Sequence, residues 1–230
     1  MIRVALTALS TVFLIACGGG SSSDSSDPTG VTMDEISVRT LGIDLVNLSG
    51  VTADFFIKES GGNSVLFDEN NKVYTVNHVD SYYHSISWTT ASPMSLDIGA
   101  QDTNSQTVQS VSEGNILNNG EKLWAIAWND EGEMTLTSGV QDPAPIEDKY
   151  RLRLFAIEDV VVTVNSSAFS VINLSKGSFS NQIILDNCDN ELILGANQRN
   201  ICDLDIGKSY LLIVDGGNWL LAAEEDTTIN

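Results

Sequence analysis

The two histidines of the chain lie in one short stretch, residues 78–84, with an aspartate between them. Alternate residues of a β-strand point to the same face, so an unbroken strand would place His78, Asp80 and His84 side by side. Imidazole and carboxylate groups together are a typical ligand set for zinc. However, Asp80 and Ser81 are also typical turn residues, and a turn there would break the alternation. The stretch therefore predicts either a metal site or an ordinary turn flanked by two unrelated histidines.

Acidic residues gather in four short segments that are rich in Asp, Glu and Asn: 68–71, 102–104, 130–133 and 186–190. Oxygen-rich loops at the tip of a β-sandwich can bind calcium. None of these segments has the ligand spacing of a twelve-residue calcium loop, and Asp and Asn are ordinary turn residues. Solvated turns are therefore favoured. We predict no cofactor, although the sequence would allow calcium in these loops and zinc at the histidines.

Two tryptophans alternate with small residues in one apolar segment. Trp124 and Trp128 are four residues apart, so on a strand both side chains lie on one face. Such a pair could form a platform for a sugar or a peptide. An aromatic contact between two sheets is the favoured alternative, because tryptophan buries a large area and Trp219 lies in the corresponding hairpin of the second half.

Sequence signatures of common enzyme classes are missing. The chain has no Gly-x-Ser-x-Gly, no Ser-x-x-Lys, no P-loop and no His-Glu-x-x-His. We therefore predict a protein that is not an enzyme. The alternative is a metal-dependent envelope hydrolase or a metal-binding protein that uses His78, Asp80 and His84.

The beginning of the chain has the layout of a secretory signal, with one positive charge before an apolar run at 4–15. This run is too short for a membrane-spanning helix, which needs roughly 20 apolar residues. Its end, Leu14-Ile15-Ala16-Cys17, resembles the lipobox of bacterial lipoproteins. The resemblance implies that residues 1–16 are a signal peptide, that Cys17 carries lipid, and that Gly18 in place of Asp directs the protein to the outer membrane. The alternative is an ordinary signal with a cysteine near its cleavage site.

With Cys17 assigned to lipid, Cys188 and Cys202 remain. Exported proteins fold in an oxidising compartment, so these two cysteines are predicted to form a disulfide. Two free buried thiols or half of a metal site are the alternatives, and the lack of a nearby histidine disfavours the metal.

A net charge of −20 excludes one large class of partner. Phosphate backbones would be repelled, so we predict no nucleic-acid binding. The expected partners are the membrane, reached through the lipid on Cys17, and a protein or glycan.

Beyond a Gly/Ser/Asp-rich tether at 17–34, short β-type segments separated by turn residues fill the chain, and no window keeps helical spacing. The clearest hairpin signal is the turn at 215–218. The predicted strands are 36–48, 53–58, 64–67, 72–78, 82–89, 94–98, 107–111, 121–128 and 134–137, then 150–157, 160–164, 169–173, 178–186, 191–194, 203–206, 209–214 and 218–223.

The two halves of this strand pattern resemble each other. Residues 76–77 and 96–100 match 172–173 and 192–196 at one offset, and residues 120–126 match 207–213. A polar segment at 141–148 with two prolines separates the halves. The sequence therefore predicts an all-β protein with two tandem antiparallel, immunoglobulin-like β-sandwich domains, at 35–140 and 149–226.

The opening of the first half resembles a bacterial family catalogued as domain of unknown function 4397. The resemblance lies in an Asn-x-Ser segment at Asn47-Leu48-Ser49, followed by a strand that carries Asp54 and two phenylalanines. The proline that follows the Asn segment in that family is missing, and the second half has 155–159 in place of Asn-x-Ser. The resemblance implies a β-sandwich of exported proteins with no known catalytic residues. We therefore expect a non-catalytic interaction or structural module at the cell envelope.

Overall fold

The computed structural model describes residues 37–167 and 169–226. The predicted signal peptide, the lipidated Cys17 and the tether lie outside these described residues. Apart from the 3-10 turn η1 (Glu69–Asn71), the regular elements of the described part are all strands. No helix in this part is long and apolar enough to cross a membrane.

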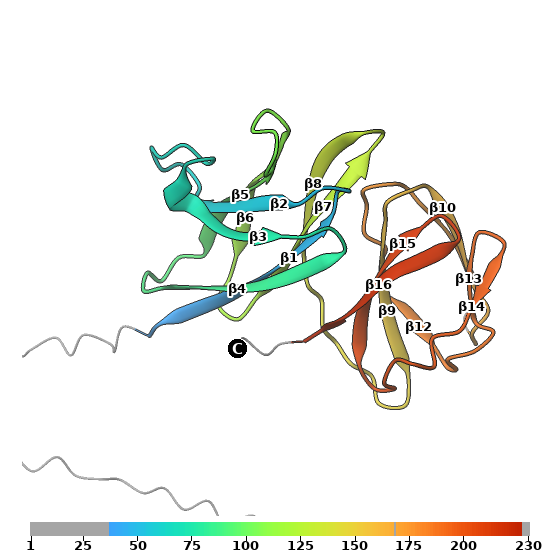
Figure 1. Ribbon diagram of the computed structural model, residues 1–230. Coiled ribbons are helices and arrows are strands. Elements are labelled where there is room, and N and C mark those ends of the chain that lie inside the picture. Colours follow the sequence, from blue (N-terminus) through green and yellow to red (C-terminus); the bar gives the residue numbers. More distant parts are fainter. Residues whose placement is uncertain (1–36, 168, 227–230) are drawn as a thin grey trace, which may run out of the picture. The chain divides into compact units, whose positions relative to one another are not determined.

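The first half of the chain forms a β-sandwich of two four-stranded sheets (Figure 1). One sheet has the order β4-β1-β7-β8 and the other has the order β3-β2-β5-β6. The strands are β1 (Arg39–Leu48), β2 (Ala53–Glu59), β3 (Lys72–Val76), β4 (Asp80–Trp88), β5 (Met94–Asp102), β6 (Gln109–Leu117), β7 (Lys122–Asp130) and β8 (Glu133–Val140).

The second half repeats this architecture. Its sheets have the orders β12-β9-β15-β16 and β11-β10-β13-β14, which are the orders of the first half with every strand number raised by eight. Two β-sandwiches in tandem are therefore present, as the sequence predicts. The strands are β9 (Tyr150–Ala156), β10 (Val160–Val164), β11 (Ser170–Leu174), β12 (Ile183–Leu185), β13 (Leu192–Leu194), β14 (Asn197–Arg199), β15 (Ser209–Asp215) and β16 (Asn218–Glu225).

Each sandwich contains one parallel strand pair, which the expectation of purely antiparallel sheets did not include. β1 runs parallel to β7, and β9 runs parallel to β15. Parallel neighbours need a long crossover connection. The strands between β1 and β7 supply it, because the chain crosses to the opposite sheet before it returns beside its first strand.

Backbone hydrogen bonds fix which residues of the two sandwiches are equivalent. Gly120 donates its N–H to Thr40 at 2.8 Å, and Gly207 donates to Lys149 at 2.9 Å, with φ near +84° at both glycines. This confirms the predicted match of 120–126 with 207–213. The predicted matches of 76–77 with 172–173 and of 96–100 with 192–196 are each wrong by two residues. For example, Phe55 pairs with Ala100, whereas its equivalent Val162 pairs with Leu194.

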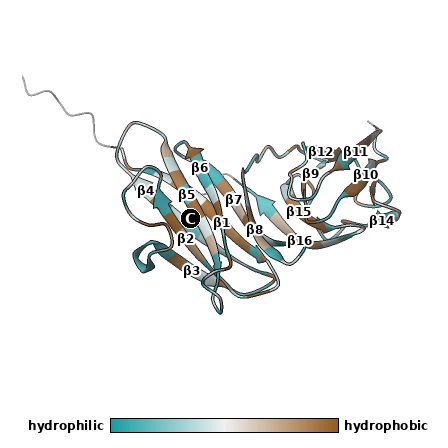
Figure 2. Ribbon diagram, turned by 90° about the horizontal axis from the view of Figure 1, so that it is seen from above, coloured by the Kyte–Doolittle hydropathy of each residue, from teal (hydrophilic) through white to brown (hydrophobic). Residues whose placement is uncertain are grey.

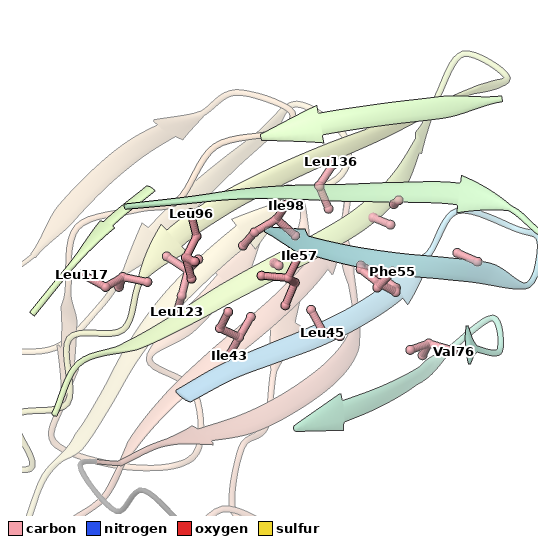
Figure 3. Close-up of a cluster of buried hydrophobic side chains, with 14 of the residues drawn as sticks. Ile43, Leu45, Phe55, Ile57, Val76, Leu96, Ile98, Leu117, Leu123 and Leu136 are labelled. Atoms are coloured by element: carbon pink, nitrogen blue, oxygen red, sulfur yellow. The ribbon is translucent and has the colours of Figure 1, made fainter. Parts of the chain in front are cut away.

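Three clusters of buried apolar side chains hold the described residues together. The first lies between the two sheets of the first sandwich, where Ile43, Leu45, Phe55 and Ile98 point toward one another (Figure 3). The second is its counterpart in the second sandwich. Figure 2 shows the alternation of apolar and polar residues along the strands that such two-layer packing requires.

The third cluster joins the two sandwiches. It is formed by the outer faces of β1 and β7 from the first sandwich and of β9 and β15 from the second. These four strands are therefore buried on both faces, and the two sandwiches belong to one compact unit, Ile36–Asn230. Its buried members are Val46, Leu48, Trp124, Ile126, Trp128, Phe155, Leu211 and Ile213.

Two predicted strands are loops. Residues 64–67 belong to the connection from β2 to β3, where Phe67 packs edge-to-face on Phe56 with ring centroids 5.3 Å apart. The apolar side chains of this loop cover the outer face of a sheet, which is why the segment looks like a strand. Residues 203–206 form a turn before β15, where the partly buried Leu204 packs against the second core.

The predicted disulfide is present. Cys188 follows β12 and Cys202 follows β14, and their Cα atoms are 4.7 Å apart. The bond encloses β13 and β14, which have only three residues each, whereas their counterparts β5 and β6 have nine. A covalent link therefore fastens a part of the second sandwich that consists of very short strands.

Candidate functional site

The repeat allows each position of the first sandwich to be compared with its equivalent in the second. Equivalent positions have the same place in the ladder and face the same core, so packing makes similar demands on both. A residue that differs sharply in chemistry from its equivalent must therefore be explained by something other than the shared fold. One set of such differences lies on the two edge strands β3 and β4.

On β4, Tyr82 pairs with Leu45 and His84 pairs with Ile43. In the second sandwich Ile183 pairs with Leu152, the equivalent of Ile43, so the buried Ile183 is the equivalent of His84. The same register places the exposed Asn181 opposite Leu154, so Asn181 is the equivalent of Tyr82. On β3, Tyr74 pairs with Phe55, and its equivalent is Ile172, which pairs with Val162. Two aliphatic positions of the second sandwich, Ile172 and Ile183, are thus tyrosine and histidine in the first. Tyr82 stands where the second sandwich has the polar Asn181.

β3 and β4 lie side by side where the edges of the two sheets meet (Figure 1). There Tyr74 of β3 stacks directly on Tyr82 of β4. Their ring centroids are 3.7 Å apart and the ring planes differ by 5°. Tyr82 is half-buried and packs against the first core, whereas Tyr74 is 46% exposed. We call these two residues the tyrosine pair. The pair closes the side of the sandwich and leaves an aromatic surface in solvent.

A hollow of about 500 Å³ runs along β3 beside Tyr74. Its polar lining comes from Glu69, Lys72 and Thr75. Asp54 fixes two of these groups, because its carboxylate lies 2.9 Å from the Lys72 ammonium and accepts a 2.5 Å hydrogen bond from the Thr75 hydroxyl. The site therefore combines one exposed aromatic ring with hydrogen-bonding groups that Asp54 holds in place.

His84 lies on the same strand face as Tyr82. Its side chain is half-buried, and burial lowers the pKa of its imidazole below the ordinary value of 6.5. The ring is therefore neutral at pH 7. A neutral imidazole adds no charge beside the tyrosine pair.

The predicted turn falls earlier in the chain than expected, and the three predicted metal ligands do not converge. Asp80 and Ser81 begin β4. The turn lies at His78 and Val79, with φ of 60° at Val79, so His78 is outside the alternation. Its Nδ1 accepts a hydrogen bond from the N–H of Gly50 at 3.1 Å. Within residues 37–167 and 169–226, no three His, Cys, Asp or Glu side chains are arranged to hold a metal ion.

The predicted acidic loops use carboxylates to stabilise the chain itself. Asp68 accepts a hydrogen bond from the N–H of Asn70 at 2.9 Å and caps η1, and Asp102 does the same for the N–H of Asn104. In the hairpin turn of β7 and β8, Asp130 lies 2.7 Å from the ammonium of Lys176. The contacts of Asp68 and Asp102 are those of ordinary turns, whereas Asp130 joins its turn to the second sandwich.

The fourth acidic loop contains the most perturbed of these carboxyls. The hydrogen bond from the Lys149 ammonium lowers the pKa of Asp186 to about 2, helped by the N–H of Ser167. Asp186 is therefore ionised at any physiological pH and holds the start of β9 to the loop after β12.

Both tryptophans that could have formed a ligand platform are buried. Trp124 and Trp128 are each 3% exposed and lie in the third cluster. Trp128 packs edge-to-face on Phe155 of the second sandwich, with ring centroids 6.2 Å apart. Both are packed between the sandwiches, and Trp128 forms the aromatic contact between sheets that its size favours.

A buried ion pair adjoins this contact. Glu225 is 2% exposed, and its Oε1 accepts hydrogen bonds of 2.9 Å from Arg153 and from the Trp124 indole. Arg153 also donates to the carbonyl of Val140, the last residue of β8, at 2.9 Å. Burial raises the pKa of Glu225, and the contacts with Trp124 and Arg153 oppose that rise. The network crosses from one sandwich to the other.

The Asn-x-Ser segment has a structural explanation. Asn47 is fully buried, and its amide donates to the carbonyls of Val51 and Val76 at 2.8 Å each. Its Oδ1 accepts from the N–H of Ser49 at 3.0 Å and from the Ser49 hydroxyl at 2.7 Å. Asn47 thereby ties β1 to the following turn and to the end of β3.

The tyrosine pair was missed at the sequence level. Tyr74 and Tyr82 lie on different strands of different sheets, and the predicted repeat alignment was displaced by two residues on β3. An alignment with the correct register would have set Tyr74 against Ile172 and shown the difference.

A scan against the models of known protein families finds no match to this chain. A search of curated proteins also finds no match.

Proposed function

We propose that this chain is a non-catalytic module of the cell envelope that binds a protein or glycan partner through the tyrosine pair. The observation that carries the proposal is the exposed Tyr74 ring, stacked on Tyr82, at a position that Ile172 occupies in the second sandwich. Aromatic residues contribute most to binding when they are held rigidly on a surface.

The second sandwich then has a supporting role. The third cluster and the ion pair of Arg153 with Glu225 fasten it to the first sandwich. A fused pair of sandwiches holds the edge strands β3 and β4 more firmly than an isolated sandwich of this size would, because more apolar area is buried. A rigid scaffold of this kind suits a binding site that must be displayed away from a membrane.

The N-terminal sequence supports a location for this module in the cell. The resemblance of Leu14-Ile15-Ala16-Cys17 to a lipobox, with Gly18 after it, supports a lipid anchor at the outer membrane. The resemblance to domain of unknown function 4397 supports an exported protein. The Gly/Ser/Asp-rich tether would let the module reach a partner at some distance from the anchor.

The proposal can be tested with the soluble chain from Gly18 onward and with envelope fractions of the bacterium that makes the protein. Fluorescently labelled wild-type chain should bind the fractions saturably. A Tyr74→Ile variant, which adopts the residue of the second sandwich, should lose that binding. The matched Ile172→Ala variant should keep it. Prior protease digestion or periodate oxidation of the fractions then distinguishes a protein partner from a glycan. Equal binding of all three chains would refute a role for the tyrosine pair.

A further inference from the structure

We propose that the site along β3 binds an uncharged oligosaccharide, with one sugar ring stacked on the exposed face of Tyr74. This inference rests on the proposed function and names the class of partner. It depends on the ring geometry, on the hollow beside the ring, on the charge around it and on the comparison of the two sandwiches.

The tyrosine pair goes beyond what packing requires. In the second sandwich, Ile172 occupies the place of Tyr74 and packs against the second core, and the exposed Asn181 occupies the place of Tyr82. Neither aromatic ring is therefore needed to close this edge. Tyrosine at both positions builds a stacked pair and leaves 46% of Tyr74 in solvent. Tyrosine is enriched among the residues that dominate binding at interfaces, so this ring indicates a role in binding.

The geometry of the pair matches what a sugar ring needs. The face of an aromatic ring is electronegative, and the C–H groups on one face of a pyranose are weakly electropositive, so the two stack. Tyr74 is held parallel to Tyr82 at 3.7 Å, so its ring is already in position before a ligand arrives. Little side-chain entropy is then lost on binding.

The hollow next to Tyr74 provides space and hydrogen-bonding groups. Its volume of about 500 Å³ falls within the range of roughly 300–1,000 Å³ that is common for small-ligand sites. Lys72 and Thr75 line it, and contacts with Asp54 hold both in place. β3 is also an edge strand, whose outer backbone groups have no neighbouring strand in the sheet. Sugar hydroxyls can form hydrogen bonds with these side chains and with the outer backbone groups of β3.

The charges that line the hollow favour uncharged glycans over anionic ones. Lys72 is the only basic residue of the hollow, and the Asp54 carboxylate already neutralises it. Glu69 adds a negative charge to the lining, and the whole chain carries −20. Uronic acids and phosphorylated sugars would therefore be repelled, whereas uncharged sugars would not.

The test is a titration of the soluble chain from Gly18 onward with tetrasaccharides, followed by saturation-transfer NMR and calorimetry. The probes are gluco-, manno- and galacto-configured uncharged tetrasaccharides, with tetragalacturonate as the anionic comparison. We expect at least one uncharged tetrasaccharide to bind. Its affinity should fall at least tenfold in Tyr74→Ile, and Tyr74→Trp and Ile172→Ala should retain it. Unfolding curves should show that Tyr74→Ile is as well folded as the wild type.

Absence of binding by every uncharged probe would overturn the inference, as would binding that Tyr74→Ile does not weaken or tighter binding of tetragalacturonate. These results are separable from failure of the proposed function. If envelope binding depends on Tyr74 and is destroyed by protease but not by periodate, the module binds a protein and only the glycan inference falls. If envelope binding does not depend on Tyr74, both fall.

Discussion

Replacement of Arg153 by methionine tests the junction between the two sandwiches. Arg153 donates to the buried carboxylate of Glu225 and to the carbonyl of Val140 in the first sandwich. Methionine has a similar length and no charge, so the variant leaves Glu225 buried with the Trp124 indole as its remaining side-chain donor. The variant should lose much of its unfolding free energy, because the buried carboxylate then has no compensating positive charge.

The expected magnitude follows from the burial of the pair. Removal of one partner of a buried ion pair costs about 3–5 kcal/mol of unfolding free energy. Replacement of both partners by apolar residues is often close to neutral. Arg153→Met should therefore lose about 3–5 kcal/mol at pH 7, and the double variant with Glu225→Leu should recover most of it.

The loss of unfolding free energy in Arg153→Met should also depend on pH. Burial already raises the pKa of Glu225 above its ordinary value of 4.5, and removal of Arg153 takes away an interaction that lowers it. The protonated form of Glu225 is then favoured in the folded state. The stability that this protonation supplies is fully present below pH 4.5 and is lost as the pH rises through the folded-state pKa. The deficit of Arg153→Met should therefore shrink between pH 7 and pH 5.

Urea unfolding followed by tryptophan fluorescence measures these free energies, and Trp124 reports directly on the network. The matched control is Lys208→Met, which breaks the exposed pair of Lys208 with Glu224, 2.8 Å apart and one residue from Glu225. An exposed pair contributes little, so this control should stay near the wild type. The reasoning fails if Arg153→Met is no less stable than the control, or if its deficit is the same at pH 5 and pH 7.

Three further outcomes are expected. Asn47→Ala removes a fully hydrogen-bonded buried amide and should lower the unfolding free energy by about 2–4 kcal/mol, whereas the exposed Asn173→Ala should change it by less than about 0.5 kcal/mol; equal urea midpoints would contradict this. The pKa of Asp186 is about 2 against an ordinary 3.8, so its contribution is present above pH 3.8 and disappears as the pH falls toward 2. Asp186→Asn should accordingly lose less thermal stability than the wild type between pH 4 and pH 2, and parallel losses would argue against the ion pair with Lys149. Cys17→Ser should move the protein from the membrane fraction to the soluble fraction on immunoblots, and continued membrane attachment would refute the lipid anchor.

Much of the fold could be predicted from local patterns. The Asp-Gly-Gly-Asn turn at 215–218 joins β15 to β16 as expected, because Gly216, with φ of 51°, supplies the backbone conformation that a tight hairpin needs. The match of 120–126 with 207–213 also holds, since the same strand and the same preceding glycine occur in both sandwiches. β14 was missed because Asn197–Arg199 is polar and only three residues long.

The candidate site could not be predicted in the same way. An apolar loop and an apolar strand have similar composition, so 64–67 was mistaken for a strand although Phe67 packs over a sheet face. The continuous apolar run from Trp124 to Trp128 is the pattern of a strand that is buried on both faces. That pattern identifies burial, but it does not identify the second sandwich as the covering partner.

The sequence alone determines the repeated β pattern, the hairpin at 215–218 and the pairing of Cys188 with Cys202, because each depends on local turn chemistry, strand periodicity or the count of cysteines. Only the tertiary structure decides that the tryptophans lie between the sandwiches and that Tyr74 stacks on Tyr82. These contacts join residues on different sheets, and their formation depends on strand register and on how sheets pack. The alternation of apolar and polar residues shows which face of a strand is apolar, but it does not show which element packs against that face.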